Sequence, residues 1–209
     1  MGRPENTMNT NDGICTPQSI WQPIVDALGA IDFDPCSHPA STVPAASQVF
    51  LPDYCTDESV PEGWHSTPEY DFTYADGLRL TWAGTGRLFF NGPYSQLPDA
   101  KNRPSWLGKF VDDRAPEDAR VGFLPVRTAC EWWQDHVMRV DVLTFLAERV
   151  KHDNVFWAKD SKDGKHKKGD PLEEGAAFSQ CLIYVGPNPA EWAEHARKLG
   201  GTIELWRLR

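Results

Sequence analysis

The sequence predicts an α/β domain in which helices cover both faces of a mostly parallel central sheet. Short apolar runs typical of buried strands, such as RLFF at 87–90 and VGFLPV at 121–126, alternate with segments whose apolar residues recur at helical spacing. The chain of 209 residues is long enough to bury one substantial core and short for two. We therefore expect a single domain over residues 14–209, preceded by a flexible leader at 1–13.

Local signals define the first elements of the domain. Thr16 can cap the N-terminus of a helix whose first turn holds Pro17, and Gly29 is expected to end that helix. The sequence AIDFDPCS at 30–37 is typical of a short strand that ends in a turn, and a second possible strand covers 49–54.

The remaining elements alternate in the same way around two polar segments. Residues 55–75 are rich in Pro, Gly, Ser and acidic residues, and 151–175 form a long lysine-rich stretch, so we expect loop insertions at both places. Strands are predicted at 87–91, 121–126, 140–146, 178–186 and 202–209, and helices at 105–115, 129–140 and 187–201.

Composition narrows the class of protein. No apolar stretch approaches the roughly 20 residues needed to cross a bilayer, and the N-terminal sequence is polar, so we expect a cytoplasmic location. The five cysteines include no CxxC pair and the histidines show no ligand spacing, which indicates reduced thiols and no bound metal. The net charge of −9 does not by itself suggest a nucleic-acid partner, although the chain is locally basic between 149 and 168.

The clearest chemical signal is Asn91-Gly92-Pro93-Tyr94, directly after the apolar run that ends at Phe90. Ligands of open α/β sheets bind outside the carboxyl ends of the strands, where this segment is expected to lie. An Asn side-chain oxygen and a neighbouring backbone carbonyl can accept two hydrogen bonds from one NH2 group, while Tyr94 offers a ring for stacking. The segment therefore predicts a site for a planar amine. The alternative is an ordinary turn, because Asn-Gly and Gly-Pro are common turn dipeptides.

A series of motifs in the same order resembles the phage-type DNA N6-adenine methyltransferase family (Dam-like), over roughly residues 14–185. The order of the motifs is more specific than any one of them. They are Thr16-Pro17, FDPCS at 33–37, ADGL at 75–78 followed by Trp82, NGPYS at 91–95, Trp106 with Lys109, LPVRT at 124–128 with Trp132, FLAERVK at 145–151, and Ala177, Phe178 and Cys181.

The resemblance implies a Rossmann-like class I methyltransferase that uses S-adenosylmethionine to methylate the N6 amine of adenine in double-stranded DNA. It implies that Asn91 to Tyr94 hold a base flipped out of the duplex, and that Asp76 lies near the adenine of the cofactor. The residues expected to shape the cofactor pocket are Thr16, Pro17, Asp34, Pro35 and Cys36. The residues expected to contact DNA are Ser95, Arg127, Lys151, Lys159, Lys162, Lys165, Lys167 and Lys168.

Two departures from the family pattern leave alternatives open. Gly92 stands where the family has proline, which keeps the acceptor carbonyl and loses rigidity, and DPCSHPAS lacks a glycine-rich turn. The amine could instead belong to cytosine, RNA or a protein glutamine. The chain could also be a non-catalytic DNA-binding or DNA-mimicking protein, as the net charge and Gly92 would allow, and the lysine-rich stretch could be a solvated loop.

Overall fold

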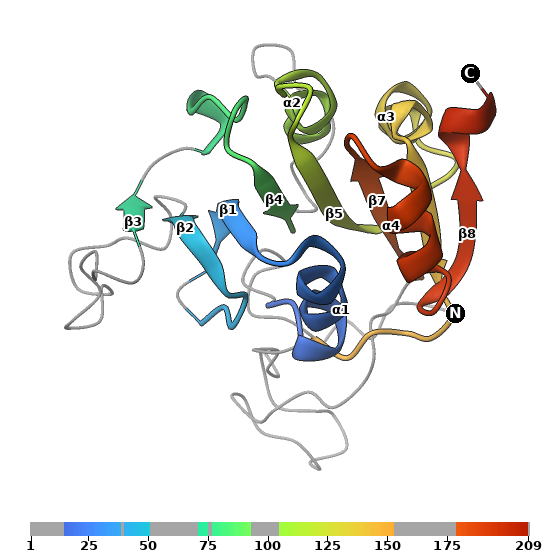
Figure 1. Ribbon diagram of the computed structural model, residues 1–209, viewed down its shortest axis with the longest axis horizontal. Helices are drawn as coiled ribbons and strands as arrows, with labels where there is room; N and C mark the ends of the chain where they lie inside the picture. The colour runs from blue at the N-terminus through green and yellow to red at the C-terminus, as the bar shows by residue number, and fades with distance from the viewer. Residues whose placement is uncertain are drawn as a thin grey trace, which may run out of the picture.

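The computed structural model describes residues 15–38, 40–50, 71–74, 77–92, 105–152 and 179–208, and the fold is built from these segments (Figure 1). The predicted leader and most of both predicted insertions lie outside them. Within the described residues, no helix is long and apolar enough to cross a membrane.

The centre of the domain is an eight-stranded sheet with the order β3-β2-β1-β4-β5-β7-β6-β8. The strands from β3 to β5 pair in parallel, whereas β7 is antiparallel to β5 and β6, and β8 is antiparallel to β6. The predicted parallel sheet is thus confirmed for the first five strands, and the other half is antiparallel. The bounds are Ile31–Ser37 for β1, Ala45–Phe50 for β2, Asp71–Tyr74 for β3, Arg87–Phe90 for β4, Ala119–Pro125 for β5, Val142–Leu146 for β6, Gln180–Val185 for β7 and Gly200–Glu204 for β8.

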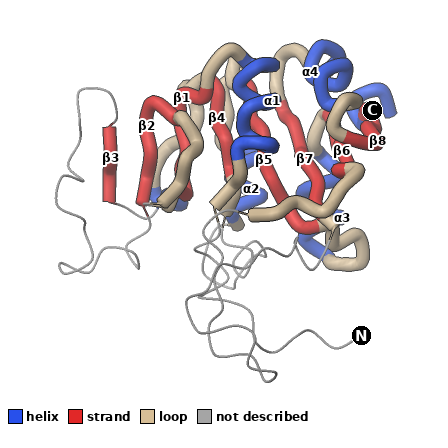
Figure 2. The backbone as a smooth tube through the Cα atoms, turned by 90° about the horizontal axis from the view of Figure 1, so that it is seen from below, coloured by secondary structure: helices blue, strands red, loops and turns tan. Residues whose placement is uncertain are grey.

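Helices cover both faces of the sheet, as the sequence predicts (Figure 2). Helices α1 (Gln18–Leu28) and α4 (Pro189–Ala196) pack through buried side chains on one face, and α2 (Trp106–Asp112) and α3 (Glu131–His136) on the other. Strand β4 serves both cores, because Leu88 and Phe90 face α2 while Phe89 faces α1.

The structure differs from the predicted elements most clearly at β2, at β3 and at the C-terminal strand. Strand β2 begins at Ala45, four residues before the predicted strand, and it contains a buried Gln48 that accepts a hydrogen bond from Ser37 Oγ at 2.7 Å. Strand β3 lies inside the predicted loop at 55–75, where parallel pairing with β2 completes the edge of the sheet. The last predicted strand ends early, because Leu205–Leu208 form a 3-10 turn.

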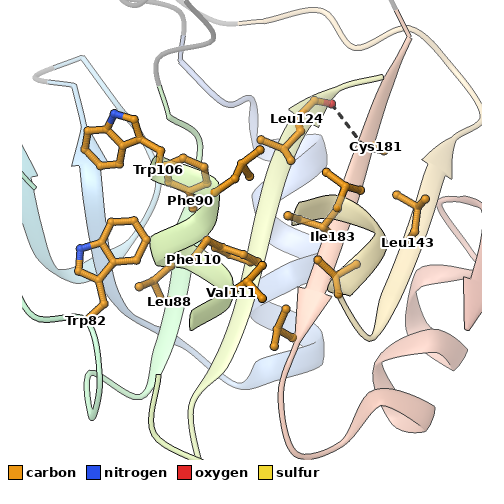
Figure 3. Close-up of a cluster of buried hydrophobic side chains, with 14 of the residues drawn as sticks. Trp82, Leu88, Phe90, Trp106, Phe110, Val111, Leu124, Leu143, Cys181 and Ile183 are labelled. Atoms are coloured by element: carbon orange, nitrogen blue, oxygen red, sulfur yellow. Dashed lines mark hydrogen bonds between the residues drawn. The ribbon is translucent and has the colours of Figure 1, made fainter. Parts of the chain in front are cut away.

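An aromatic cluster lies directly beneath the end of β4 (Figure 3). Phe90 is fully buried between Trp82, Trp106 and Phe110, with ring centroids 5.9, 5.8 and 5.9 Å away. Three partners of this size leave the Phe90 ring little room to move, since protein interiors are packed as densely as organic crystals.

The beginning of β4 is fixed by buried and bidentate ion pairs. Asp32 accepts from the Arg87 guanidinium at 2.6 and 2.7 Å and from its backbone N–H at 2.8 Å. Asp118 accepts from the backbone N–H groups of Gly84 and Gly86, both at 3.0 Å, and pairs at 3.2 Å with the fully buried Arg120. These bonds hold the turn that leads into β4.

Candidate functional site

The candidate site lies where the strand order reverses. Successive strands extend from β1 to one side through β2 and β3, and the chain then crosses to β4 on the other side of β1. Phe33 of β1 pairs in parallel with Leu88 of β4, so both strands end at the same edge of the sheet. This switch point is the place where open α/β sheets bind ligands.

Asn91, the first residue after β4, contacts a residue 75 positions away in the sequence. Its Nδ2 donates a hydrogen bond to Thr16 Oγ1 at 2.9 Å. Nδ2 and Oδ1 lie on opposite sides of the amide carbon, so this bond directs Oδ1 away from Thr16. The structure therefore brings a predicted catalytic residue into contact with a predicted cofactor residue.

Thr16 does not play the local role that the sequence predicts. Helix α1 has Pro17 as its N-cap and no side-chain cap bond, and the Thr16 hydroxyl accepts from Asn91 instead. Gly29 does end the helix, as predicted, with a positive φ of 86° and a bond from its N–H to Val25 O. Thr16 and Pro17 are both buried.

Gly92 is buried, and the side chain of Phe90 leaves no room for a Cβ at this position. A Cβ at this position would lie 2.2 Å from Cζ and 2.4 Å from Cε2 of Phe90. Its φ is outside the left-handed region, so backbone freedom is not what requires glycine here. Glycine is required because the Phe90 ring occupies the space that any side chain, including a proline ring, would need.

Asp34 is a buried carboxyl group in the middle of β1. Only 3% of its surface is exposed, and removal from water raises its pKa to about 7, against the opposing effect of hydrogen bonds. Its Oδ1 accepts from the backbone N–H of Cys36 at 3.0 Å. Of its predicted neighbours in the cofactor pocket, Pro35 is buried and Cys36 is partly exposed.

A close backbone contact joins the end of β1 to the segment that follows β3. A Cβ on Gly77 would lie 2.1 Å from the carbonyl oxygen of Pro35, and Trp82 Nε1 donates to Gly77 O at 2.9 Å. Only glycine allows this approach. Asp76 itself lies outside the described residues, but its neighbour in sequence is held against the predicted cofactor residue Pro35.

One residue that contacts this region, His152, was not predicted from the sequence. Its Nδ1 lies 3.4 Å from the carbonyl oxygen of Cys15, and its Nε2 lies 2.6 Å from Nε2 of Gln180 on β7. An amide nitrogen can only donate, so His152 Nε2 accepts and Nδ1 carries the proton that faces Cys15. Burial lowers the pKa of His152 to about 4, which agrees with a neutral ring.

Two of the predicted DNA-contacting residues lie among the described residues. Arg127 follows β5 and Lys151 follows β6, and both are exposed. Strands β4, β5 and β6 run in the same direction, so both cations lie at the edge of the sheet that holds Asn91. The remaining predicted residues, Pro93, Tyr94, Ser95, Lys159, Lys162, Lys165, Lys167 and Lys168, lie outside the described residues.

In the described part of the chain, no group of three or more His, Cys, Asp or Glu side chains is arranged to hold a metal ion. Comparison with known protein families and with curated protein sequences finds no match for this chain.

Proposed function

We propose that this protein transfers a methyl group from S-adenosylmethionine to the exocyclic N6 amine of adenine in DNA. The observation that carries this proposal is the Thr16–Asn91 hydrogen bond at the carboxyl end of β4. It uses the donor side of the Asn91 amide, so an incoming amine at the switch point meets the acceptor side.

The sheet supports the same proposal. The order β3-β2-β1-β4-β5 with helices on both faces is that of a doubly wound α/β domain. The whole sheet, with the antiparallel β7 between β5 and β6, is compatible with the class I methyltransferase fold implied by the sequence motifs.

The chemistry required at Asn91 is the activation of a poor nucleophile. The lone pair of the adenine amine is delocalised into the ring. Acceptance of its two N–H groups by Asn91 Oδ1 and the Gly92 carbonyl would return electron density to the nitrogen and fix its direction. The catalytic effect then comes from positioning and preoriented dipoles, with no covalent enzyme intermediate.

Asp34 and Pro35 of β1 fit the proposed cofactor. S-adenosylmethionine supplies an electrophilic methyl group on a sulfonium, and its amino acid part carries an ammonium group. Asp34 is a buried carboxyl whose charged form is disfavoured by burial, so a neighbouring cation would stabilise it. Among the described residues, Asp34 is therefore suited to hold that ammonium group, with Pro35 and Gly77 adjacent to it.

Recognition of DNA would rest on groups around the same edge. A base must leave the duplex to reach Asn91, at a cost of a few kcal/mol, and stacking on Tyr94 would offset roughly 1–3 kcal/mol of it. Arg127 and Lys151 would bind phosphates, which makes the affinity fall with added salt.

The non-catalytic alternative loses one of its two supports. Gly92 suggested a degraded motif, but its contact with Phe90 explains the glycine through packing, with the acceptor carbonyl retained in the chain. The net charge of −9 remains as the observation that favours this alternative.

The proposal is tested by calorimetry with S-adenosylmethionine and by tritium transfer from the labelled cofactor to unmethylated duplex DNA, followed by nucleoside analysis. We expect cofactor binding and label in N6-methyladenine. Asn91→Ala should abolish transfer and keep cofactor affinity, while Asn188→Ala, at an exposed asparagine before α4, should change neither.

The possible outcomes separate the candidates. Label in cytosine, RNA or protein would keep the amine site and change the substrate. If the wild-type protein shows neither S-adenosylmethionine binding by calorimetry nor methyl transfer, this would contradict the proposal and favour the non-catalytic alternative.

A further inference from the structure

We propose that Thr16 is a positioning residue for Asn91, and that its hydroxyl holds the Asn91 amide in place at the end of β4. A side-chain amide can rotate by 180° and exchange its donor and acceptor sides. In the structure the Thr16 hydroxyl accepts from Nδ2 at 2.9 Å, which leaves Oδ1 on the side away from Thr16. Because a hydroxyl can donate or accept, it anchors the amide in either orientation. The sequence predicts a helix cap and a cofactor contact for Thr16, and no contact with Asn91.

Thr16 is well placed for this role because its own position is fixed. It is 2% exposed, and it is followed by Pro17, whose backbone is extended at the start of α1. Its hydroxyl is not used as a helix cap. A buried hydroxyl next to a proline has few alternative positions, so the bond to Asn91 holds the amide against a rigid partner.

The residue before Thr16 is held by a second set of contacts. The carbonyl oxygen of Cys15 accepts from His152 Nδ1 at 3.4 Å, and Gln180 on β7 donates to the other ring nitrogen at 2.6 Å. Phe123 of β5 packs against the same ring, with centroids 5.5 Å apart. Strands β5 and β7 therefore support, through His152, the segment that orients the amide of Asn91.

The effect of Thr16 on methyl transfer rests on the proposed function, whereas its effect on the Asn91 amide does not. Two measurements keep these apart. The first is the ¹⁵N–¹H spectrum of the Asn91 side chain in the protein without ligand, assigned by its loss in Asn91→Ala. The second is the steady-state rate of methyl transfer to DNA, together with the affinity for S-adenosylmethionine.

The variants are Thr16→Val, which keeps the shape and removes the hydroxyl, and Thr16→Ser, which keeps the hydroxyl. The matched control is Thr144→Val on β6, where the hydroxyl of a buried threonine lies 3.1 Å from Thr202 Oγ1 in another part of the sheet. Should Thr16→Val fail to fold, Thr16→Ala takes its place in the same comparison.

We expect Thr16→Val to shift the Asn91 amide signals and accelerate their hydrogen exchange, and Thr16→Ser and Thr144→Val to leave them as in the wild type. In the transfer assay, Thr16→Val should lower kcat by about three- to tenfold, the loss expected for one hydrogen bond, with cofactor affinity unchanged. Thr16→Ser should restore the rate.

Two results would overturn the inference. Unchanged Asn91 amide signals in Thr16→Val would show that the hydroxyl does not hold the amide. A weaker affinity for S-adenosylmethionine with an unchanged kcat would make Thr16 a cofactor residue. A wild-type protein that neither binds the cofactor nor transfers a methyl group would contradict the proposed function, while the amide spectra would still decide the role of Thr16.

Discussion

Replacement of Gly92 by alanine is expected to destabilise the protein through one identifiable contact. The added Cβ would lie 2.2 and 2.4 Å from two ring carbons of Phe90, far inside the usual separation of about 3.5 Å. Because Phe90 is itself held between Trp82, Trp106 and Phe110, the ring cannot withdraw freely. Overpacking of this kind costs about 1–3 kcal/mol, which lowers Tm by roughly 2–12 °C in a domain of this size.

A double-mutant cycle tests the assignment of that cost. Phe90→Leu removes Cζ, Cε1 and Cε2, the three atoms nearest to the new Cβ, so Gly92→Ala should cost almost nothing in the Phe90→Leu background. Gly92→Pro should follow the same pattern because its ring begins at the same Cβ. Unfolding in urea, followed by circular dichroism, measures each corner of the cycle.

Gly201→Ala is the control for this cycle, because a Cβ at Gly201 would meet no atom within 4 Å. It should change the free energy of unfolding by no more than about 0.5 kcal/mol. The reasoning would be refuted if Gly92→Ala were as stable as the wild type, or if the costs of Gly92→Ala and Phe90→Leu simply added.

Three further predictions concern buried groups. Arg120→Met removes one partner of a buried ion pair and should cost about 3 kcal/mol in urea unfolding. Burial raises the pKa of Asp34 from 3.8 to about 7, so protonated Asp34 contributes stability that is fully present below pH 3.8 and is lost as the pH rises to 7. The effect of Asp34→Asn on the free energy of unfolding should therefore be more stabilising at pH 8 than at pH 4, by on the order of 4 kcal/mol. Urea unfolding of the variant and the wild type at both pH values measures this difference. Burial raises the pKa of the Cys181 thiol, so alkylation followed by peptide mass spectrometry should label Cys36 in the native protein and Cys181 only after unfolding.

The sequence was sufficient for elements whose signals are local. Apolar periodicity and the terminal Gly29 located α1, and the apolar run at 87–90 located β4 and therefore the edge at which Asn91 lies. The helix predicted at 129–140 is present as α3, and its Trp133 is 1% exposed in the core. In each case the pattern needed no knowledge of a distant partner.

The features that could not be predicted from the sequence depend on contacts between residues that are far apart in the chain. Strand β3 has four residues, and only its pairing with β2 distinguishes it from the surrounding polar segment. Thr16 is a good N-cap by local rules, but Asn91 is its partner in the fold. His152 had no signal at all, because its role depends on Cys15 and Gln180, which meet it only in the folded sheet.

The glycine at position 92, where the family motif has proline, is interpreted differently from the sequence and from the structure. In the sequence, glycine in place of proline implied a looser end to β4. In the structure, the backbone at Gly92 is covered by the ring of Phe90, and the preceding amide is bound to the buried Thr16. The rigidity that a proline ring would give through a fixed φ is supplied here by packing on one side and a hydrogen bond on the other. Changes to the core at Phe90 should therefore reach the acceptor groups of the site, although Phe90 itself makes no contact with solvent.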